Sequence, residues 1–277
     1  MREVVQGVFL EDQYPGVILG AVAAGGEVLL VDTPLRIEDG REWLGELSAH
    51  GRSRMLVLLD SHPDRVLGAR GLDLAVFAHQ STRETVASWP DVYRPSAGLG
   101  AEADRLRRVA GLHRAVPHVA FTESLTVMLG DTPVELRHRP GPTAGSVWVI
   151  VPSRRVVFVG DTVSLREPPY LGEADPKAWL EGLHELRGGA FRKYRILSSR
   201  DGVVRGEALP AMAAFLRKVD GRLTRMQARG EPAEATGRLA QQLARTYRVG
   251  AARKEMVAQR LRSGLETLYL RRYADDE

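Results

Sequence analysis

The sequence predicts an α/β protein, and three features of the 277-residue chain support this class. Short runs rich in Val, Leu and Ile recur through the first 200 residues, and segments with helical periodicity lie between some of them. From Val119 onward the apolar runs follow one another closely, which indicates an antiparallel sheet. Beyond Gly206 the apolar residues recur at helical spacing, which predicts a helical C-terminal extension.

The first half of the chain is expected to alternate between strands and helices. The expected elements are a strand at 28–32, a helix at 38–50, strands at 55–59 and 74–78, and then a further helix. Ser81 or Thr82 could cap that last helix, because a hydroxyl oxygen accepts hydrogen bonds from free backbone N–H groups.

The second half is expected to hold short strands, one helix and then the helical extension. The expected elements are strands at 125–129, 134–138, 147–151 and 156–159, a helix at 175–187 and a strand at 194–198. The extension is expected to break near Gly230 and again near Gly250. We therefore predict two units, residues 1–212 and residues 213–277.

Composition excludes several classes of protein. The chain is 44% hydrophobic and 27% charged, which excludes general disorder, a collagen-like repeat and a coiled-coil rod. It contains no cysteine, so a disulfide, a thiolate metal ligand and a thiol nucleophile are all excluded. Because the N-terminal segment is charged and no apolar run is long enough to span a bilayer, we expect a cytoplasmic protein without a membrane partner.

Polar residues follow three of the expected strands. One strand is followed by Asp60, Ser61, His62, Pro63, Asp64 and Arg65. A second strand is followed by Asp161 and Thr162, and a third by Arg200 and Asp201. Polar groups that gather at strand ends commonly form the functional site of an α/β fold. Each Asp alone could equally be a turn former or a helix cap.

Read in order, these motifs resemble the metallo-β-lactamase superfamily over roughly residues 4–215. The resemblance rests on the strand 29–31 followed by Asp32-Thr33, the loop 60–65, and the segment Pro140-Gly141-Pro142-Thr143-Ala144-Gly145-Ser146 followed by Gly160-Asp161-Thr162. The resemblance implies a four-layer αββα sandwich. It also implies a hydrolase-like pocket at one edge of the sheets.

The resemblance also implies which positions would hold two metal ions, and most of them are changed here. His62, Asp64 and Asp161 keep residues of the family's ligand set, whereas Asp60, Arg65, Pro142 and Asp201 replace its other ligands. A side chain such as that of Pro142 cannot coordinate a metal, and the guanidinium of Arg65 would repel one. A one-residue shift would put Arg200 at the place of Asp201. A dinuclear zinc centre is therefore not expected.

The charges of the predicted pocket must be offset in some other way. Asp60, Asp64, Asp161 and Asp201 bring four negative charges together. The candidate counter-charges are Arg65, Arg200, a protonated His62 or one divalent ion such as Mg²⁺, Mn²⁺ or Ca²⁺.

Three functions remain open at this point. The first is a degenerate, inactive or weakly active hydrolase-like protein, that is, a possible pseudoenzyme. The second is a hydrolase of an ester, thioester or phosphodiester that uses one divalent metal (Zn, Mn or Mg). The metal ligands would be Asp60, His62, Asp64 and Asp161, with Asp201 as a further possible ligand. Asp64 would be the catalytic residue that orients or deprotonates water. The third is a binding module that holds an anionic small molecule in the pocket or nucleic acid on the extension.

The extension carries the positive charge of the chain. Residues 213–277 carry a formal charge of +6, whereas the whole chain carries +4. A solvated helix face is the default interpretation of its arginines, so nucleic acid is not the expected partner. Packing on the α/β core, or a homodimer formed through these helices, is the preferred use of their apolar side.

Overall fold

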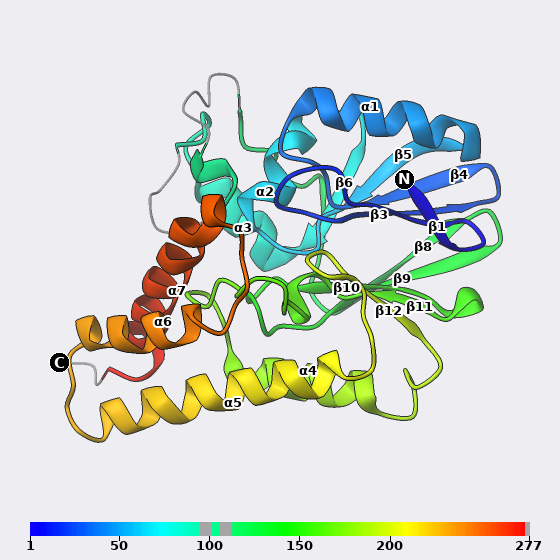
Figure 1. Ribbon diagram of the computed structural model, residues 1–277. Helices are drawn as coiled ribbons and strands as arrows, with labels where there is room; N and C mark the ends of the chain where they lie inside the picture. Colours follow the sequence, from blue (N-terminus) through cyan, green and yellow to red (C-terminus); the bar gives the residue numbers. More distant parts are fainter. Residues whose placement is uncertain (95–100, 106–111, 275–277) are drawn as a thin grey trace.

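Two β-sheets pack face to face, and helices cover both outer faces (Figure 1). This computed structural model describes residues 1–94, 101–105 and 112–274. The four-layer αββα sandwich predicted from the sequence is confirmed.

The first sheet has its strands in chain order. They are β1 Arg2–Val5, β2 Val8–Glu11, β3 Leu19–Ala24, β4 Glu27–Val31, β5 Arg52–Val57, β6 Ala75–His79 and β7 Val119–Phe121. β1 to β4 are antiparallel, and β4 to β7 run parallel. Helical segments connect the first three of these parallel strands: α1 Ile37–Leu47, η1 Ser48–His50, α2 Pro63–Val66 and η2 Leu67–Gly71. α3 Gln80–Ser88 and η3 Ala103–Arg105 lie between β6 and β7.

The second sheet is mainly antiparallel, as expected. Its order is β13-β12-β11-β10-β9-β8, with β8 Ser124–Leu129, β9 Thr132–His138, β10 Val147–Val151, β11 Val156–Phe158, β12 Arg195–Ser198 and β13 Gly202–Val203. β11 and β12 are the parallel pair, because η5 Gly160–Thr162 and α4 Pro176–Arg187 carry the chain back between them. A short turn, η4 Pro152–Arg154, joins β10 to β11.

Strand alternation assigns each buried side chain to a layer. In β10, Val149 and Val151 face the core between the sheets, where they join Leu29 of β4. Trp148 and Ile150 point to the opposite face and pack with α4 and α5. Both faces of this strand are therefore apolar, which explains its uninterrupted hydrophobic run.

The C-terminal extension folds back on the second sheet's outer layer. It contains α5 Ala208–Gln227, η6 Ala233–Ala235, α6 Thr236–Ala244 and α7 Ala251–Arg272, with the breaks where the sequence predicts them. Apolar residues of all three helices share one core with α4. The predicted boundary between residues 212 and 213 falls inside α5, and residues 275–277 lie outside the described residues. None of the described helices is both long and apolar enough to cross a bilayer.

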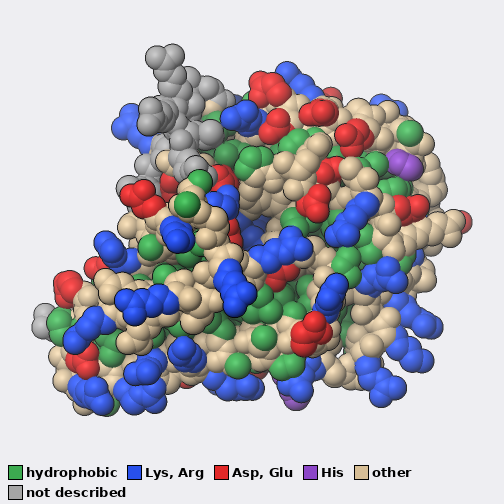
Figure 2. Space-filling model, viewed as in Figure 1, with side chains coloured by type: hydrophobic (Ala, Val, Ile, Leu, Met, Phe, Trp, Pro, Cys, Tyr) green, Lys and Arg blue, Asp and Glu red, His purple; other side chains and the backbone are tan. Residues whose placement is uncertain are grey.

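Arginines of the extension divide into an exposed and an inward-facing set. Figure 2 shows Lys and Arg side chains spread over the lower face of the molecule, where α5 lies. Four arginines of α7 instead contact the sandwich: Arg253 and Arg260 pair with Glu167, Arg271 donates to the carbonyl of Gly172, and Arg272 pairs with Asp175. The solvated face expected for these residues is therefore wrong for Arg253 and Arg260, whereas Arg271 and Arg272 stay exposed while they make these contacts.

The N-terminus of α3 also differs from the sequence expectation. The helix begins at Gln80, and His79 is its cap, because the Nδ1 atom of His79 accepts a hydrogen bond from the backbone N–H of Ser81 at 3.1 Å. Ser81 and Thr82 are already inside the helix. An imidazole nitrogen can thus cap a helix N-terminus, a role in which a hydroxyl or carboxylate oxygen is more common.

Asp175 should contribute measurably to stability as the cap of α4. Its Oδ1 atom accepts from the backbone N–H groups of Lys177 and Ala178, both at 3.0 Å. We expect Asp175→Ala to lower the free energy of unfolding by about 1 kcal/mol in urea titration. Arg272→Ala removes the ion pair with Asp175 but keeps the cap, so it serves as the control. An equal loss in both variants would contradict the capping role.

Candidate functional site

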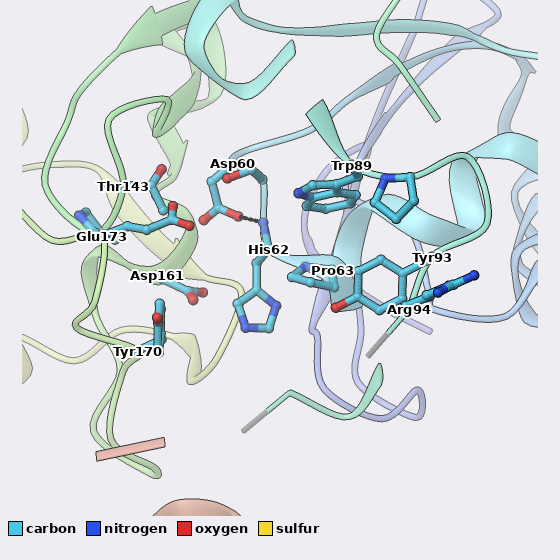
Figure 3. Close-up of a pocket in the computed structure, with 13 residues that line it drawn as sticks. Asp60, His62, Pro63, Trp89, Tyr93, Arg94, Thr143, Asp161, Tyr170 and Glu173 are labelled. Atoms are coloured by element: carbon cyan, nitrogen blue, oxygen red, sulfur yellow. Dashed lines mark hydrogen bonds between the residues drawn. The ribbon is translucent and has the colours of Figure 1, made fainter. Parts of the chain in front are cut away.

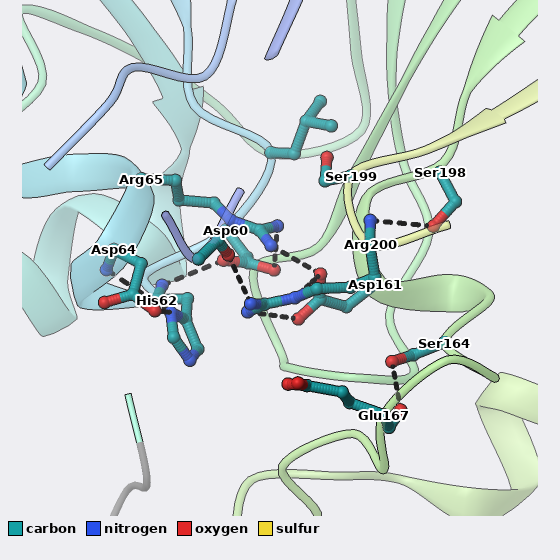
Figure 4. Close-up of polar contacts among 12 residues, drawn as sticks. Asp60, His62, Asp64, Arg65, Asp161, Ser164, Glu167, Ser198, Ser199 and Arg200 are labelled. Atoms are coloured by element: carbon teal, nitrogen blue, oxygen red, sulfur yellow. Dashed lines mark hydrogen bonds and ion pairs between the residues drawn. The ribbon is translucent and has the colours of Figure 1, made fainter. Parts of the chain in front are cut away.

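Four strand ends bring charged residues to one edge of the two sheets (Figure 4). Asp32 follows β4 and Asp60 follows β5 in the first sheet, whereas Asp161 follows β11 and Arg200 follows β12 in the second. Because each pair of strands is parallel, their carboxyl ends meet at the same edge. The site is therefore built from both sheets.

Arg65 lies at the centre of this cluster and is fully buried. It comes from α2, directly after the loop that holds Asp60. Its Nη1 atom donates to Oδ2 of Asp60 at 2.8 Å, and its Nη2 atom donates to Oδ1 of Asp161. Its Nε atom lies 3.7 Å from Oδ2 of Asp32. One guanidinium thus joins carboxylates of both sheets.

Arg200 holds Asp161 from the other side. Its Nε and Nη2 atoms donate to the two carboxylate oxygens of Asp161, at 2.9 Å and 3.0 Å. This is the bidentate geometry that makes arginine–carboxylate pairs strong. Its remaining Nη1 atom donates to the backbone carbonyl of Gly16. Arg200 therefore has partners on every side.

Asp201 lies apart from this cluster of ion pairs. It was predicted as a pocket residue and possible metal ligand, but its two oxygens accept from the backbone N–H groups of Leu165 and Arg166, at 2.8 Å and 3.2 Å. The neighbouring Arg200 contacts Asp161 in its place. The shift by one residue that the sequence left open is the arrangement found here.

Asp64 and His62 form a local unit at the start of α2. Asp64 is fully buried, and its two oxygens accept from the backbone N–H groups of Glu102 and Ala103, at 3.0 Å and 2.8 Å. Its own N–H group donates to Nδ1 of His62 at 3.3 Å. The predicted catalytic residue thus anchors segment 101–103, and both of its oxygens are already hydrogen-bonded.

Burial and the two arginines act on the pKa values in opposite directions. Burial raises the pKa of Asp161, but Arg200 and Arg65 outweigh it and hold this pKa well below its usual range. For Asp32 burial outweighs the attraction of Arg65, so the pKa of Asp32 rises to about 6. Burial also raises the pKa of Asp60, because it disfavours the charged carboxylate. For the same reason burial, together with the positive charge of Arg200, lowers the pKa of His62 well below its usual value. His62 is therefore neutral, and the counter-charges are Arg65 and Arg200.

α7 adds a second layer of ion pairs to this edge. Arg253 donates to both oxygens of Glu167 and to Glu102, and the buried Arg260 donates to Glu167 at 3.3 Å. Glu102 belongs to the segment that Asp64 anchors. The C-terminal extension is thus connected to the site by charged groups.

A cavity of about 210 Å³ opens beside the cluster (Figure 3). Asp60, His62, Pro142 and Asp161 lie on its wall, together with aromatic residues that include Trp89 and Tyr170. Arg65 is buried behind Asp60 and Asp161. Most of the lining is apolar, and its polar groups include carboxylates, one imidazole and the hydroxyls of Ser61 and Thr143.

The residues present do not fit a zinc centre. Both oxygens of Asp161 accept from arginines, and Asp60 accepts from Arg65 and from the backbone N–H of His62. Pro142 has no donor atom in its side chain. Within the described part of the chain, no three His, Asp or Glu side chains are placed to hold one ion.

Residues 19–200 match the sequence pattern of the metallo-beta-lactamase superfamily. The chain belongs to this superfamily. No curated protein is similar enough in sequence to match it.

Solved structures of superfamily members have the same fold. A metallo-beta-lactamase from Pontibacter korlensis is 18% identical, with a TM-score of 0.60, and the similarity covers 78% of this chain and 97% of that one. A metallo-beta-lactamase from Erythrobacter litoralis is 19% identical, with a TM-score of 0.54, and the similarity covers 79% and 99%. The superfamily pattern ends at residue 200, so α5, α6 and α7 lie beyond it.

Three residues of the site were not identified from the sequence. Asp32 was noted as a fold motif only, yet its oxygens accept from the N–H of Leu59 and the hydroxyl of Ser199 inside the cluster. Glu167 belongs to no motif, because its arginine partners come from the distant helix α7. Glu173 belongs to no motif either, and only the fold places it on the cavity wall. The left-handed backbone of Asp32, with φ of 62°, turns the chain at the strand end and gives no sequence signal beyond Asp itself.

Arg65 should be a major determinant of stability. Arg65→Met would leave Asp60 and Asp161 short of a buried counter-charge, so we expect the free energy of unfolding to fall by about 3–5 kcal/mol at neutral pH. Urea titration measures the loss. Arg41→Met, on the exposed face of α1, is the control and should change stability by less than about 0.5 kcal/mol. A similar small change for Arg65→Met would contradict the role of the buried ion pairs.

Asp32 should give stability a pH dependence of defined sign. Its pKa is about 6 in the folded protein and about 4 when unfolded, so the folded state retains a proton that the unfolded state loses. We therefore expect the stability of the wild type relative to Asp32→Asn to fall by on the order of 3 kcal/mol as the pH rises from about 4 to about 6. Unfolding at several pH values measures this difference. The same comparison with Asp131→Asn, at an exposed turn, is the control. If the stability of the wild type relative to Asp32→Asn rises over this pH range, the raised pKa of Asp32 is refuted.

Proposed function

We propose that this chain is a metal-independent, hydrolase-like member of the superfamily, in which Arg65 replaces the positive charge of a metal and the adjacent cavity binds a small organic molecule. The observation that carries the proposal is the double hydrogen bond of Arg65 to Asp60 and Asp161. A guanidinium keeps its charge at any ordinary pH and has the planar donors that carboxylates require. It can therefore balance the cluster permanently, without an ion from solution.

The electrostatics support this replacement. Burial would lower the pKa of Arg65, but Asp161, Asp60 and Asp32 outweigh it and raise this pKa above its ordinary value. With Arg200 on its other side, Asp161 faces two permanent positive charges. A divalent cation would have to displace one of them, and the displaced guanidinium would then be buried without a partner.

The consequence for activity is that metal-dependent hydrolysis is lost. We propose that the chain is inactive or weakly active toward esters, thioesters and phosphodiesters. The cavity remains open and apolar beside the ion pairs, which is the usual form of a small-molecule site. Binding is therefore the function that this site supports best.

Elemental analysis of untagged protein tests the proposal. The protein is purified without chelator and then supplied in turn with Zn²⁺, Mn²⁺, Mg²⁺ and Ca²⁺. We expect far less than one metal per chain in every case, and no metal-stimulated hydrolysis of ester, thioester or phosphodiester substrates. About one tightly bound metal per chain would overturn the proposal.

Two variants identify the cause of the low metal affinity. Pro142→His adds a donor but leaves both arginines in place, so we expect no zinc uptake. The triple change Arg65→His, Pro142→His and Arg200→His adds three donors and removes both guanidiniums, so we expect it to bind zinc. If the single variant binds zinc as well as the triple variant does, the arginines are not what excludes the metal. Circular dichroism verifies that both variants are folded.

A further inference from the structure

Glu173 presents a carboxylate to the cavity beside Asp60 (Figure 3). It lies in the segment just before α4 and lines the cavity. Asp60 and Asp161 each pair with an arginine, whereas Glu173 makes no ion pair in the described residues. Burial in the cavity wall and the nearby Asp60 raise the pKa of Glu173, and they outweigh the attraction of Arg271 and the side-chain hydrogen bond with Ser61.

Aromatic side chains form the opposite wall of the cavity. Trp89 and Tyr93 lie beside Pro63 there, and Tyr170 lies near Asp161 (Figure 3). Aromatic faces attract cations through their negative face potential, and the attraction grows when the cation leaves water. A carboxylate facing aromatic rings is therefore a suitable environment for an organic cation.

His62 adds a directed hydrogen-bond donor. It is nine-tenths buried, and it lines the cavity. Its Nδ1 atom accepts from the N–H of Asp64, so the neutral ring carries its proton on Nε2, which has no partner among the described residues. A ligand that fills the cavity would satisfy this donor with a hydrogen-bond acceptor.

The positive charges nearby do not favour an anion. Arg65 and Arg200 are held by Asp60, Asp161 and backbone groups, and neither is offered to the cavity. Arg94 is the basic side chain among the described lining residues, and it is exposed. The anionic ligand that the sequence analysis left open as one alternative would need a free arginine inside the cavity, whereas Glu173 presents a carboxylate there.

We infer that the cavity binds an organic ammonium ion with an apolar body, its charge near Glu173 and Asp60 and its body against Trp89 and Tyr93. This inference rests on the proposed function, because a metal on Asp60 and Asp161 would repel such a ligand. The ligand class is an organic ammonium ion, and a hydrogen-bond acceptor on its body would in addition pair with His62.

Three probes of one shape and different charge test the inference. Benzylamine, benzyl alcohol and benzoate are titrated into the full chain by calorimetry and by tryptophan fluorescence. Trp43, Trp148 and Trp179 are fully buried, so a fluorescence change at this site reports Trp89, and Trp89→Phe should abolish it. We expect benzylamine to bind at least about tenfold more tightly than benzoate, with benzyl alcohol between them.

The variant Glu173→Gln keeps the shape of the side chain and removes its charge. We expect it to weaken benzylamine binding about tenfold and to leave benzyl alcohol binding unchanged. Glu181→Gln, on the exposed face of α4, is the matched control and should change neither. Tighter binding of benzoate than of benzylamine, no binding of any probe, or equal losses for the two variants would each overturn the inference.

The same titrations in the presence of EDTA and of Zn²⁺ separate this inference from the proposed function. If the purified protein holds stoichiometric metal, the proposed function fails whatever the probes do. If it holds no metal and the probes bind without preference for positive charge, the proposed function survives and the assignment of the ligand fails.

Discussion

The buried guanidinium of Arg65 connects the two halves of the sandwich. Asp60 follows a strand of the first sheet and Asp161 follows a strand of the second, and Arg65 donates to both. Without this positive charge, carboxylates from two sheets would meet in a region with little water, where like charges repel strongly. Arg65 therefore helps to fix the mutual position of the sheets at this edge. The loop that carries Arg65 is also the loop that shapes the cavity.

The other ion pairs of the site extend outward from this centre. Arg200 holds the second side of Asp161 and also the backbone of Gly16, which ties β12 to the N-terminal part of the first sheet. Farther out, Arg253 and Arg260 of α7 hold Glu167. The C-terminal extension lies beyond the matched superfamily pattern, yet it is connected to the site through these pairs. Its basic character is used in part for internal contacts rather than for a charged outer surface.

Most strands and helices from β4 onward could be predicted because local patterns specify them, whereas β1, β2 and β3 were not among the expected elements. The uninterrupted apolar run of β10, the Pro at the start of α4 and the glycines between the C-terminal helices are visible without knowledge of the fold. The cap of α3 was missed, since a histidine is not a usual capping residue and its role depends on the rotamer it adopts. The inward direction of the α7 arginines was missed for a similar reason, because their acceptors are about 80 or more residues away in the chain.

The sequence by itself determined the superfamily and the order of the elements from β4 onward, because these depend on residue types at fixed places along the chain. Only the tertiary structure decided how the remaining charges are paired. It placed Arg200 rather than Asp201 on Asp161, turned Asp64 toward segment 101–103, and placed Glu173 in the wall of a cavity that aromatic residues also line. Such pairings follow from the directions of side chains on separate sheets. No spacing along the sequence encodes those directions.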